Sequence, residues 1–157
     1  MTVRQRPRAL DTILYGGLAV GVLDGLFAFV FYGAILGVKP LAIFQSVAAG
    51  MLGRASYEGG VPTFLLGLFM HFIVASCIAG VYYLAALKLP VLIRYAVPAG
   101  LIYGLIAYLV MNYVVIPLSA IGSGPSPPLS TFLTAFIAHA FLVGLPIALI
   151  TRRSARN

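Results

Sequence analysis

Four long, uninterrupted apolar stretches make up most of this chain, and they restrict its fold more than any other feature. A helix needs about 20 apolar residues to cross a lipid bilayer, and each stretch has that length. Strands of a membrane barrel would instead alternate polar and apolar residues over about ten positions. The pattern therefore predicts four transmembrane helices, at residues 12–36, 62–87, 95–118 and 130–151.

The scarcity of charge excludes a soluble domain. Charged residues are 8% of the 157 residues, against about 25% in soluble globular domains. Ten basic and three acidic side chains are too few to cover the surface of a soluble protein of this size. The single cysteine, Cys77, excludes an intramolecular disulfide. We expect an all-α integral membrane protein with a single membrane domain over residues 1–157.

The basic residues predict how the chain is oriented. With four crossings both termini lie on one side, together with the loop between the second and third spans. That side holds eight of the ten basic residues, and the other side only Lys39 and Arg54. Lys and Arg are enriched in cytoplasmic loops, so we expect both termini in the cytoplasm. The eight are Arg4, Arg6, Arg8, Lys88, Arg94, Arg152, Arg153 and Arg156.

A further short helix is expected between the first and second spans. Residues 41–53 are apolar and nearly uncharged, but too few to cross a bilayer. The preceding Pro40 suits the first turn of a helix. The run therefore predicts an interfacial or re-entrant helix. Its apolar residues with the spacing of one helical face are Phe44, Val47, Ala48, Met51 and Leu52.

One strongly polar side chain lies inside each predicted span: Asp24, His71, Asn112 and His139. A helical rise of 1.5 Å per residue places the two histidines at similar depth, with Asp24 slightly deeper and Asn112 nearer the outer surface. Asp24 is the one charge within a span, where an ionisable group costs about 2.5–3.5 kcal/mol on insertion scales. We therefore predict one intramembrane polar cluster in the outer half of the bundle.

Several functions fit such a cluster. A chain of His and Asp residues is typical of proton or ion pathways, and satisfied hydrogen bonds between helices are a structural alternative. His71 and His139 could also ligate a b-type haem from opposite sides. Adding Asp24 gives an open transition-metal site, but no thiolate or further nitrogen strengthens it. No cofactor and no metal is therefore predicted.

Small residues recur every four positions and predict closely packed helices. Any such face left unused inside the bundle would pair with a second copy or with a larger membrane complex. The faces are Gly17, Gly21 and Gly25 in the first span, Gly67, His71, Ala75 and Ala79 in the second, and Gly100 and Gly104 in the third.

The chain lacks the sequence signatures of common enzymes. It has no glycine-rich phosphate loop, no Gly-x-Ser-x-Gly elbow and no His-Glu-x-x-His pair. We therefore expect a multi-pass membrane protein without enzymatic activity, as an accessory or assembly subunit. The alternatives are a small oligomeric proton or ion transporter and a haem-binding electron carrier. The expected partner is the lipid bilayer, and no basic helix predicts nucleic-acid binding.

A series of residues over the last three spans also suggests a family. In chain order they are His71, Tyr82-Tyr83, Pro90, Gly100-x-x-x-Gly104, Pro117-Leu118, a proline-containing loop, His139 and Arg152-Arg153. This series resembles the YagU-like family of bacterial inner-membrane proteins, whose function is uncharacterised. The resemblance covers residues 67–153, and the first outer connection departs from the family in length and content. It implies a location in the cytoplasmic membrane and no established activity.

Overall fold

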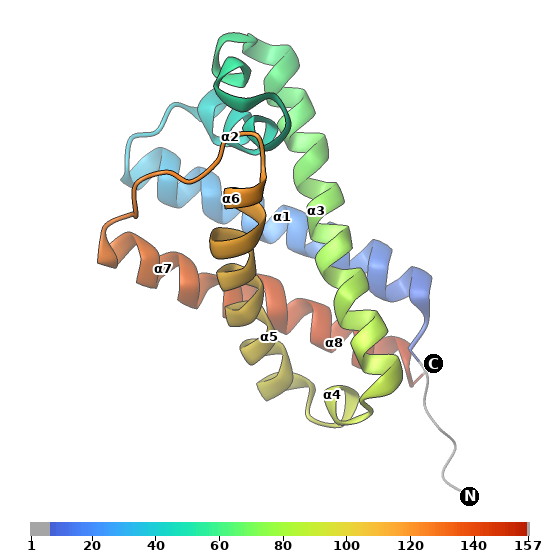
Figure 1. The fold of residues 1–157 in the computed structure, drawn as a ribbon. Coiled ribbons are helices and arrows are strands. Elements are labelled where there is room, and N and C mark those ends of the chain that lie inside the picture. Colours follow the sequence, from blue (N-terminus) through green and yellow to red (C-terminus); the bar gives the residue numbers. More distant parts are fainter. Residues whose placement is uncertain (1–6, 157) are drawn as a thin grey trace, which may run out of the picture.

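Four long helices form the structure, a computed structural model that describes residues 7–156 (Figure 1). They are Asp11–Ile35, Gly60–Lys88, Ala96–Leu118 and Leu129–Ser154, each long and apolar enough to cross a membrane. Residues 7–156 contain no strand. The prediction of four such helices is confirmed. The largest boundary difference is at the end of the fourth, which reaches Ser154 instead of residue 151.

Three of the four long helices contain wider, π-helical turns. The first consists of α1 (Gly16–Ala28) between π turns at Asp11–Tyr15 and Phe29–Ile35, and the second is the continuous α3 (Gly60–Lys88). The third runs from α5 (Ala96–Val110) through Met111–Val115 into α6 (Ile116–Leu118), and the fourth from α7 (Leu129–His139) through Ala140–Gly144 into α8 (Leu145–Ser154). Two of these π turns end two residues before a proline, Pro117 in the third long helix and Pro146 in the fourth. Proline cannot donate to the carbonyl one turn earlier, so the preceding turn widens.

The predicted short helix is present as α2 (Pro40–Leu52), followed by a 3₁₀ turn at Gly53–Glu58. It packs against the first turns of α3 (Figure 1). The close approach is possible because Gly67 of α3 has no side chain: a Cβ there would overlap with the carbonyl of Phe44. The loop after α6 is tied to the same helix, since the Ala120 amide donates to the Gly50 carbonyl over 2.9 Å.

The apolar face of α2 identified in the sequence is only partly buried. Phe44 and Ala48 are buried, whereas Met51 and Leu52 are 59% and 46% exposed. Gln45 is buried in their place. Its amide donates to the Gly60 carbonyl over 3.0 Å and to a threonine hydroxyl of α3 over 3.1 Å. These hydrogen bonds offset the cost of burying a polar group, which apolar spacing alone does not detect.

The apolar core fills the half of the bundle that holds both termini (Figure 1). Here α4 (Val91–Arg94) connects α3 to α5. The Tyr82 side chain is 1% exposed, and its hydroxyl donates to the Leu92 carbonyl over 3.1 Å. The Tyr103 hydroxyl donates to the Ile78 carbonyl over 2.6 Å. We call this half the terminal half and the half with α2 the distal half.

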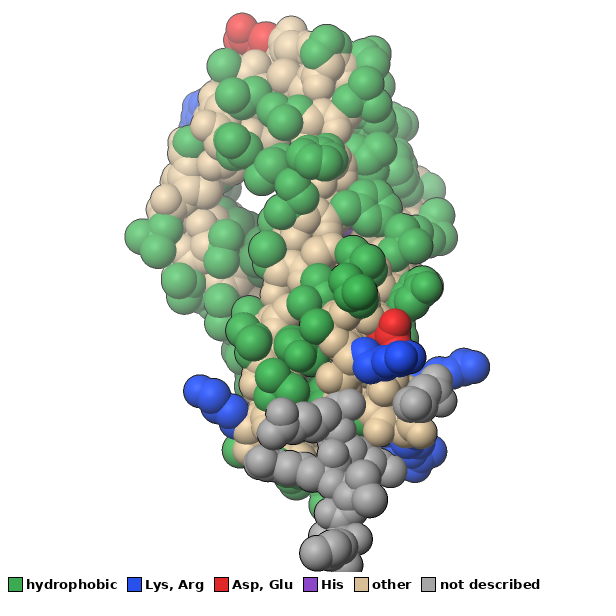
Figure 2. Space-filling model, turned by 90° about the vertical axis from the view of Figure 1, so that its right-hand side faces the viewer, with side chains coloured by type: hydrophobic (Ala, Val, Ile, Leu, Met, Phe, Trp, Pro, Cys, Tyr) green, Lys and Arg blue, Asp and Glu red, His purple; other side chains and the backbone are tan. Residues whose placement is uncertain are grey.

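The small-residue faces are confirmed as packing surfaces inside the chain. Gly17 and Gly21 of α1 lie against Ser76 and Phe72 of α3. On the other side of the bundle, Gly100 and Gly104 of α5 lie against the backbone of the fourth long helix. Apolar side chains cover the middle of the outer surface, while most Lys and Arg side chains in view gather at the terminal end (Figure 2).

Candidate functional site

Asp24 and His139 lie close together in the interior of the bundle. Asp24 lies in α1, and His139 is the last residue of α7, directly before a π turn. The carboxylate Oδ1 lies 3.8 Å from the imidazole Nε2, and the side chains are 21% and 19% exposed, respectively. Among residues 7–156, this is the single approach of an acid to a basic side chain within 4 Å that joins two long helices. The first and fourth long helices therefore bring these two groups together.

The other nitrogen of His139 determines what this pair can do. Nδ1 lies 2.8 Å from the Ala135 carbonyl oxygen, which can only accept, so Nδ1 carries a hydrogen. Nε2 is therefore the atom that gains or loses a proton, and it faces Asp24. With no proton between them, a lone pair would face a carboxylate. A proton on His139 Nε2 would therefore lie on the side of the ring that faces the carboxylate.

His71 approaches the same region from α3. Its Nε2 lies 3.0 Å from the carbonyl oxygen of Gly21, one turn before Asp24, and therefore donates a hydrogen there. The ring lies edge-on to Phe44 and Phe72, with centroids 5.3 and 5.8 Å apart. The glycine face of α1 lets this ring lie directly against the helix backbone.

Asn112 lies apart from this group. Its amide donates to the Tyr108 carbonyl over 2.9 Å, one turn earlier in the same helix. The side chain lines a different cavity, of about 650 Å³, under the proline-containing loop after α6. The structure therefore gathers three of the four predicted residues, without a hydrogen bond from Asn112 to any of them. Tyr108 instead contacts the pair, because its ring lies 4.8 Å from the His139 ring, centroid to centroid.

A cavity of about 370 Å³ lies between α1, α3 and α2, and both Asp24 and His71 line it. Tyr32, Phe44 and Tyr57 add aromatic rings to its wall, and Ser46 adds a hydroxyl. Sequence reasoning did not identify these residues as part of the site. The position of Tyr32 could have been predicted, because it follows Asp24 by eight residues and so lies on the same helical face.

The apolar core begins one helical turn below the site on each helix. Val20 precedes Asp24 by four residues, Ala75 follows His71 by four, and Val143 follows His139 by four. These three side chains belong to the buried core of the terminal half. The site therefore has a cavity on its distal side and close-packed apolar side chains on its terminal side.

These contacts give little support to a haem between the two histidines. The Nε2 of His71 donates to a backbone carbonyl, and the Nε2 of His139 faces a carboxylate. Haem ligation by two histidines needs both lone pairs directed at one iron. Within residues 7–156, no three His, Cys, Asp or Glu side chains are arranged to hold a metal ion. Proton exchange is the chemistry that the geometry suits.

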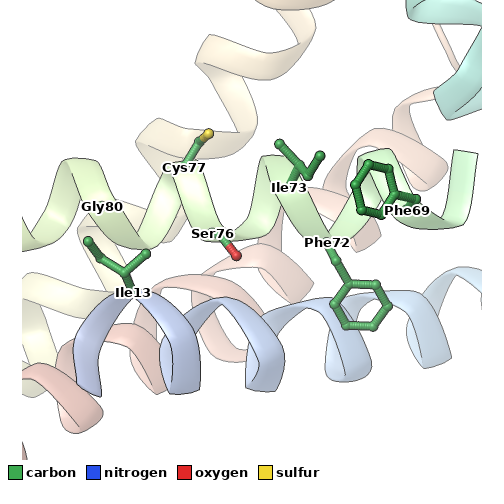
Figure 3. A pocket seen from close by; sticks show the side chains of 7 residues that line it. All are labelled: Ile13, Phe69, Phe72, Ile73, Ser76, Cys77 and Gly80. Carbon is green, nitrogen blue, oxygen red and sulfur yellow. The ribbon is translucent and has the colours of Figure 1, made fainter. Parts of the chain in front are cut away.

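A separate groove on the outer surface carries no comparable chemistry. It has a volume of about 460 Å³ and is lined by α3, including Phe69, Ile73 and Cys77, and by Ile13 of the π turn before α1. Figure 3 shows Phe72 and Ser76 directed at α1, whereas Cys77 points away from it. Its residues include no acid, base or carboxamide.

Comparisons with protein-family models, with curated proteins and with solved structures find no match to this chain. The candidate site therefore rests on its own geometry.

Proposed function

We propose that the chain is a multi-pass protein of the bacterial cytoplasmic membrane, with the terminal half facing the cytoplasm. The support is the distribution of basic residues along the sequence, eight of which lie near the two ends of the chain or around the turn between the second and third apolar helices. Two of the eight, Arg4 and Arg6, lie outside the described residues. In this orientation α2 and its cavity face the outer side. The membrane location agrees with the resemblance to the YagU-like family, which stays part of this proposal.

Cysteine labelling checks the orientation. Cys77 is replaced by serine, and a new cysteine is introduced as Ser126→Cys in the distal loop or as Arg94→Cys at the terminal end. A membrane-impermeant maleimide applied to intact cells is expected to label the Ser126→Cys protein and not the Arg94→Cys protein. Both are expected to react after the cells are lysed. The opposite pattern in intact cells would contradict the proposed orientation.

We further propose that the protein moves protons in the membrane and that Asp24 and His139 form its protonation site. The observation that carries this proposal is the 3.8 Å approach of Asp24 Oδ1 to His139 Nε2, with the Nδ1 hydrogen already committed to a carbonyl. Ionisable groups inside a membrane are costly and are typical of proton relays. A pair that holds a single proton between two helices is suited to loading and unloading that proton, and this activity needs no covalent chemistry.

Access to this site is one-sided. The cavity extends from Asp24 to Tyr57 and Val38, which are 45% and 37% exposed at the distal end. On the terminal side the buried core residues Val20 and Val143 lie one helical turn from Asp24 and His139. The proton is therefore exchanged with the distal, outer side. Release to the cytoplasm requires the helices below the pair to separate.

Proton flux into proteoliposomes tests this function. A potassium diffusion potential drives protons through the purified protein, and an internal pH-sensitive dye records the rate. Asp24→Asn is expected to reduce the flux about tenfold or more, because the amide cannot bind the transferred proton. Asp11→Asn is the matched control: it removes the other acid of the same long helix, which pairs with Arg8 at the terminal end. It is expected to leave the flux unchanged.

A role as an accessory or assembly subunit is the second candidate. The open apolar groove lined by α3 and Ile13 favours it, because such grooves on membrane helices accept other apolar helices. The same proteoliposomes separate the two candidates. Wild-type protein with no flux above that of empty liposomes contradicts the proton function and favours the subunit role.

A further inference from the structure

The cavity beside Asp24 combines one acid with several aromatic rings. Asp24 supplies the carboxylate, and four of the lining residues are Tyr32, Phe44, Tyr57 and His71. These rings come from four separate elements: the π turn after α1, the helix α2, the 3₁₀ turn after α2, and α3. The chain thus brings aromatic side chains around a carboxylate from several directions.

The charge of the cavity wall and the oxygen atoms it offers indicate which class of ligand could bind there. An anion is disfavoured because Asp24 is the one charged residue among the lining residues, apart from any proton on His71. A bare metal cation needs about six oxygen ligands. The wall offers side-chain oxygens only from Asp24, two tyrosines and Ser46. An organic cation requires one counter-charge and aromatic faces, because a substituted ammonium is attracted to the faces of Tyr and Phe rings.

The volume limits the size of such a cation. A cavity of about 370 Å³ corresponds to about twelve water-sized atoms at roughly 30 Å³ each. An ammonium group with short apolar substituents or one benzyl group has this size. Larger amphipathic cations with several rings do not fit without movement of α2.

We propose that this cavity binds a small organic cation, an ammonium with apolar substituents, in exchange for the proton of the Asp24–His139 pair. The inference rests on the proposed function, since it uses the same protonation site. Before exchange, Asp24, His139 and one proton are together neutral. The cation takes the place of that proton as the counter-charge of Asp24, His139 becomes neutral, and the proton leaves through the cavity to water. The charge of the site is the same before and after.

Other titratable groups around the carboxylate do not replace His139 in this exchange. Tyr32 and Tyr57 line the cavity from the first long helix and the 3₁₀ turn, and Tyr108 of α5 contacts the His139 ring. Tyrosine has an ordinary pKa near 10, so it stays protonated at neutral pH in water. His71 donates from Nε2 to the Gly21 carbonyl. His139 alone directs its exchangeable nitrogen at Asp24.

The test is equilibrium binding of benzyltrimethylammonium to the purified full-length protein in detergent, measured by calorimetry. The neutral control ligand is neopentylbenzene, which has the same shape without the charge. Binding of the cation is expected to be about tenfold tighter than binding of the neutral compound. Repeating the titration in two buffers with different ionisation enthalpies is expected to show release of about one proton per bound cation. Binding is therefore expected to weaken as the pH falls.

Three variants assign the binding to this cavity. Asp24→Asn is expected to weaken cation binding about tenfold or more and to abolish proton release. Tyr32→Leu is expected to weaken it several-fold, while Tyr32→Phe, which keeps the aromatic face, retains wild-type affinity. Asp11→Asn is the control acid and is expected to change nothing. Size-exclusion profiles identify any variant that fails to fold, and the Tyr32 pair tests the cavity independently of Asp24.

The outcomes separate this inference from the proposed function. Equal affinity for the charged and neutral compounds, or no binding of the cation, overturns the cation site. If wild-type proteoliposomes still conduct protons in that case, the proton function stands alone. The protein could instead bind the cation and release a proton, yet show no proton flux in proteoliposomes without the cation. That result supports the exchange site and overturns proton movement in the absence of a cation.

Discussion

Replacing His139 with leucine is expected to lower the free energy of unfolding by about 2 kcal/mol, because Asp24 then lacks its partner inside the bundle. Loss of one partner of a fully buried pair costs about 3–5 kcal/mol. The smaller value is expected here because both side chains are about one-fifth exposed. The proton flux is expected to fall about a hundredfold, since no base remains beside the carboxylate. Unfolding in mixed micelles and flux in proteoliposomes provide the two measurements.

The double variant Asp24→Asn with His139→Leu distinguishes pairing from simple packing. Its stability is expected to exceed that of His139→Leu alone, because the unpaired carboxylate is gone, while its flux stays abolished. A double-mutant cycle with Asp24→Asn then gives the interaction energy of the pair, expected to be about 1–2 kcal/mol. Additive effects, with no interaction energy, would contradict direct contact between the two side chains in solution.

The sequence predicted the cluster through depth rather than through helix rotation. Counting along the helices placed His71 and His139 at similar depth and Asp24 slightly deeper, and the structure brings all three into one region. Depth does not determine which way a side chain points around its helix axis. The sequence therefore did not indicate that the Asn112 amide would donate to the Tyr108 carbonyl of its own helix. The π turn that begins at residue 111 further shifts the helical phase there.

The fold was readable because its strongest signals are local. Continuous apolar stretches determine the four long helices, and spaced glycines determine where these helices approach each other. The cavity under α2 could not be predicted, because it is formed by contacts between residues far apart in the sequence. It depends on Tyr32, Phe44 and Tyr57 meeting across separate elements, and on a buried Gln45 that holds α2 against α3. No periodic pattern in the sequence records such contacts.

Gly144→Ala is expected to destabilise the protein strongly. A Cβ at Gly144 would overlap with the carbonyl oxygen of Gly100 and the amide nitrogen of Gly104, and would lie 2.7 Å from the Gly104 Cα. All three are backbone atoms, so no rotamer change relieves the overlap, and α5 must separate from the fourth long helix. Overpacking of this kind costs about 3 kcal/mol, at the upper end of its usual range.

The matched control is Gly80→Ala, which adds the same methyl group to a long helix whose nearest neighbours there are Ile13 side-chain atoms at 4.0 Å. Its melting temperature in detergent is expected to equal or exceed that of the wild type, because alanine favours the helix more than glycine does. Equal melting temperatures for Gly144→Ala and the wild type would contradict the close packing of α5 against the fourth long helix.

The contact between Gly144 and α5 also positions the Asp24–His139 site. Gly104, which faces Gly144, lies against the backbone of His139 and Ala140. A methyl group that pushes these two helices apart is therefore expected to move His139 relative to Asp24. Gly144→Ala protein that still folds is therefore expected to lose proton flux as well as stability, whereas Gly80→Ala retains both.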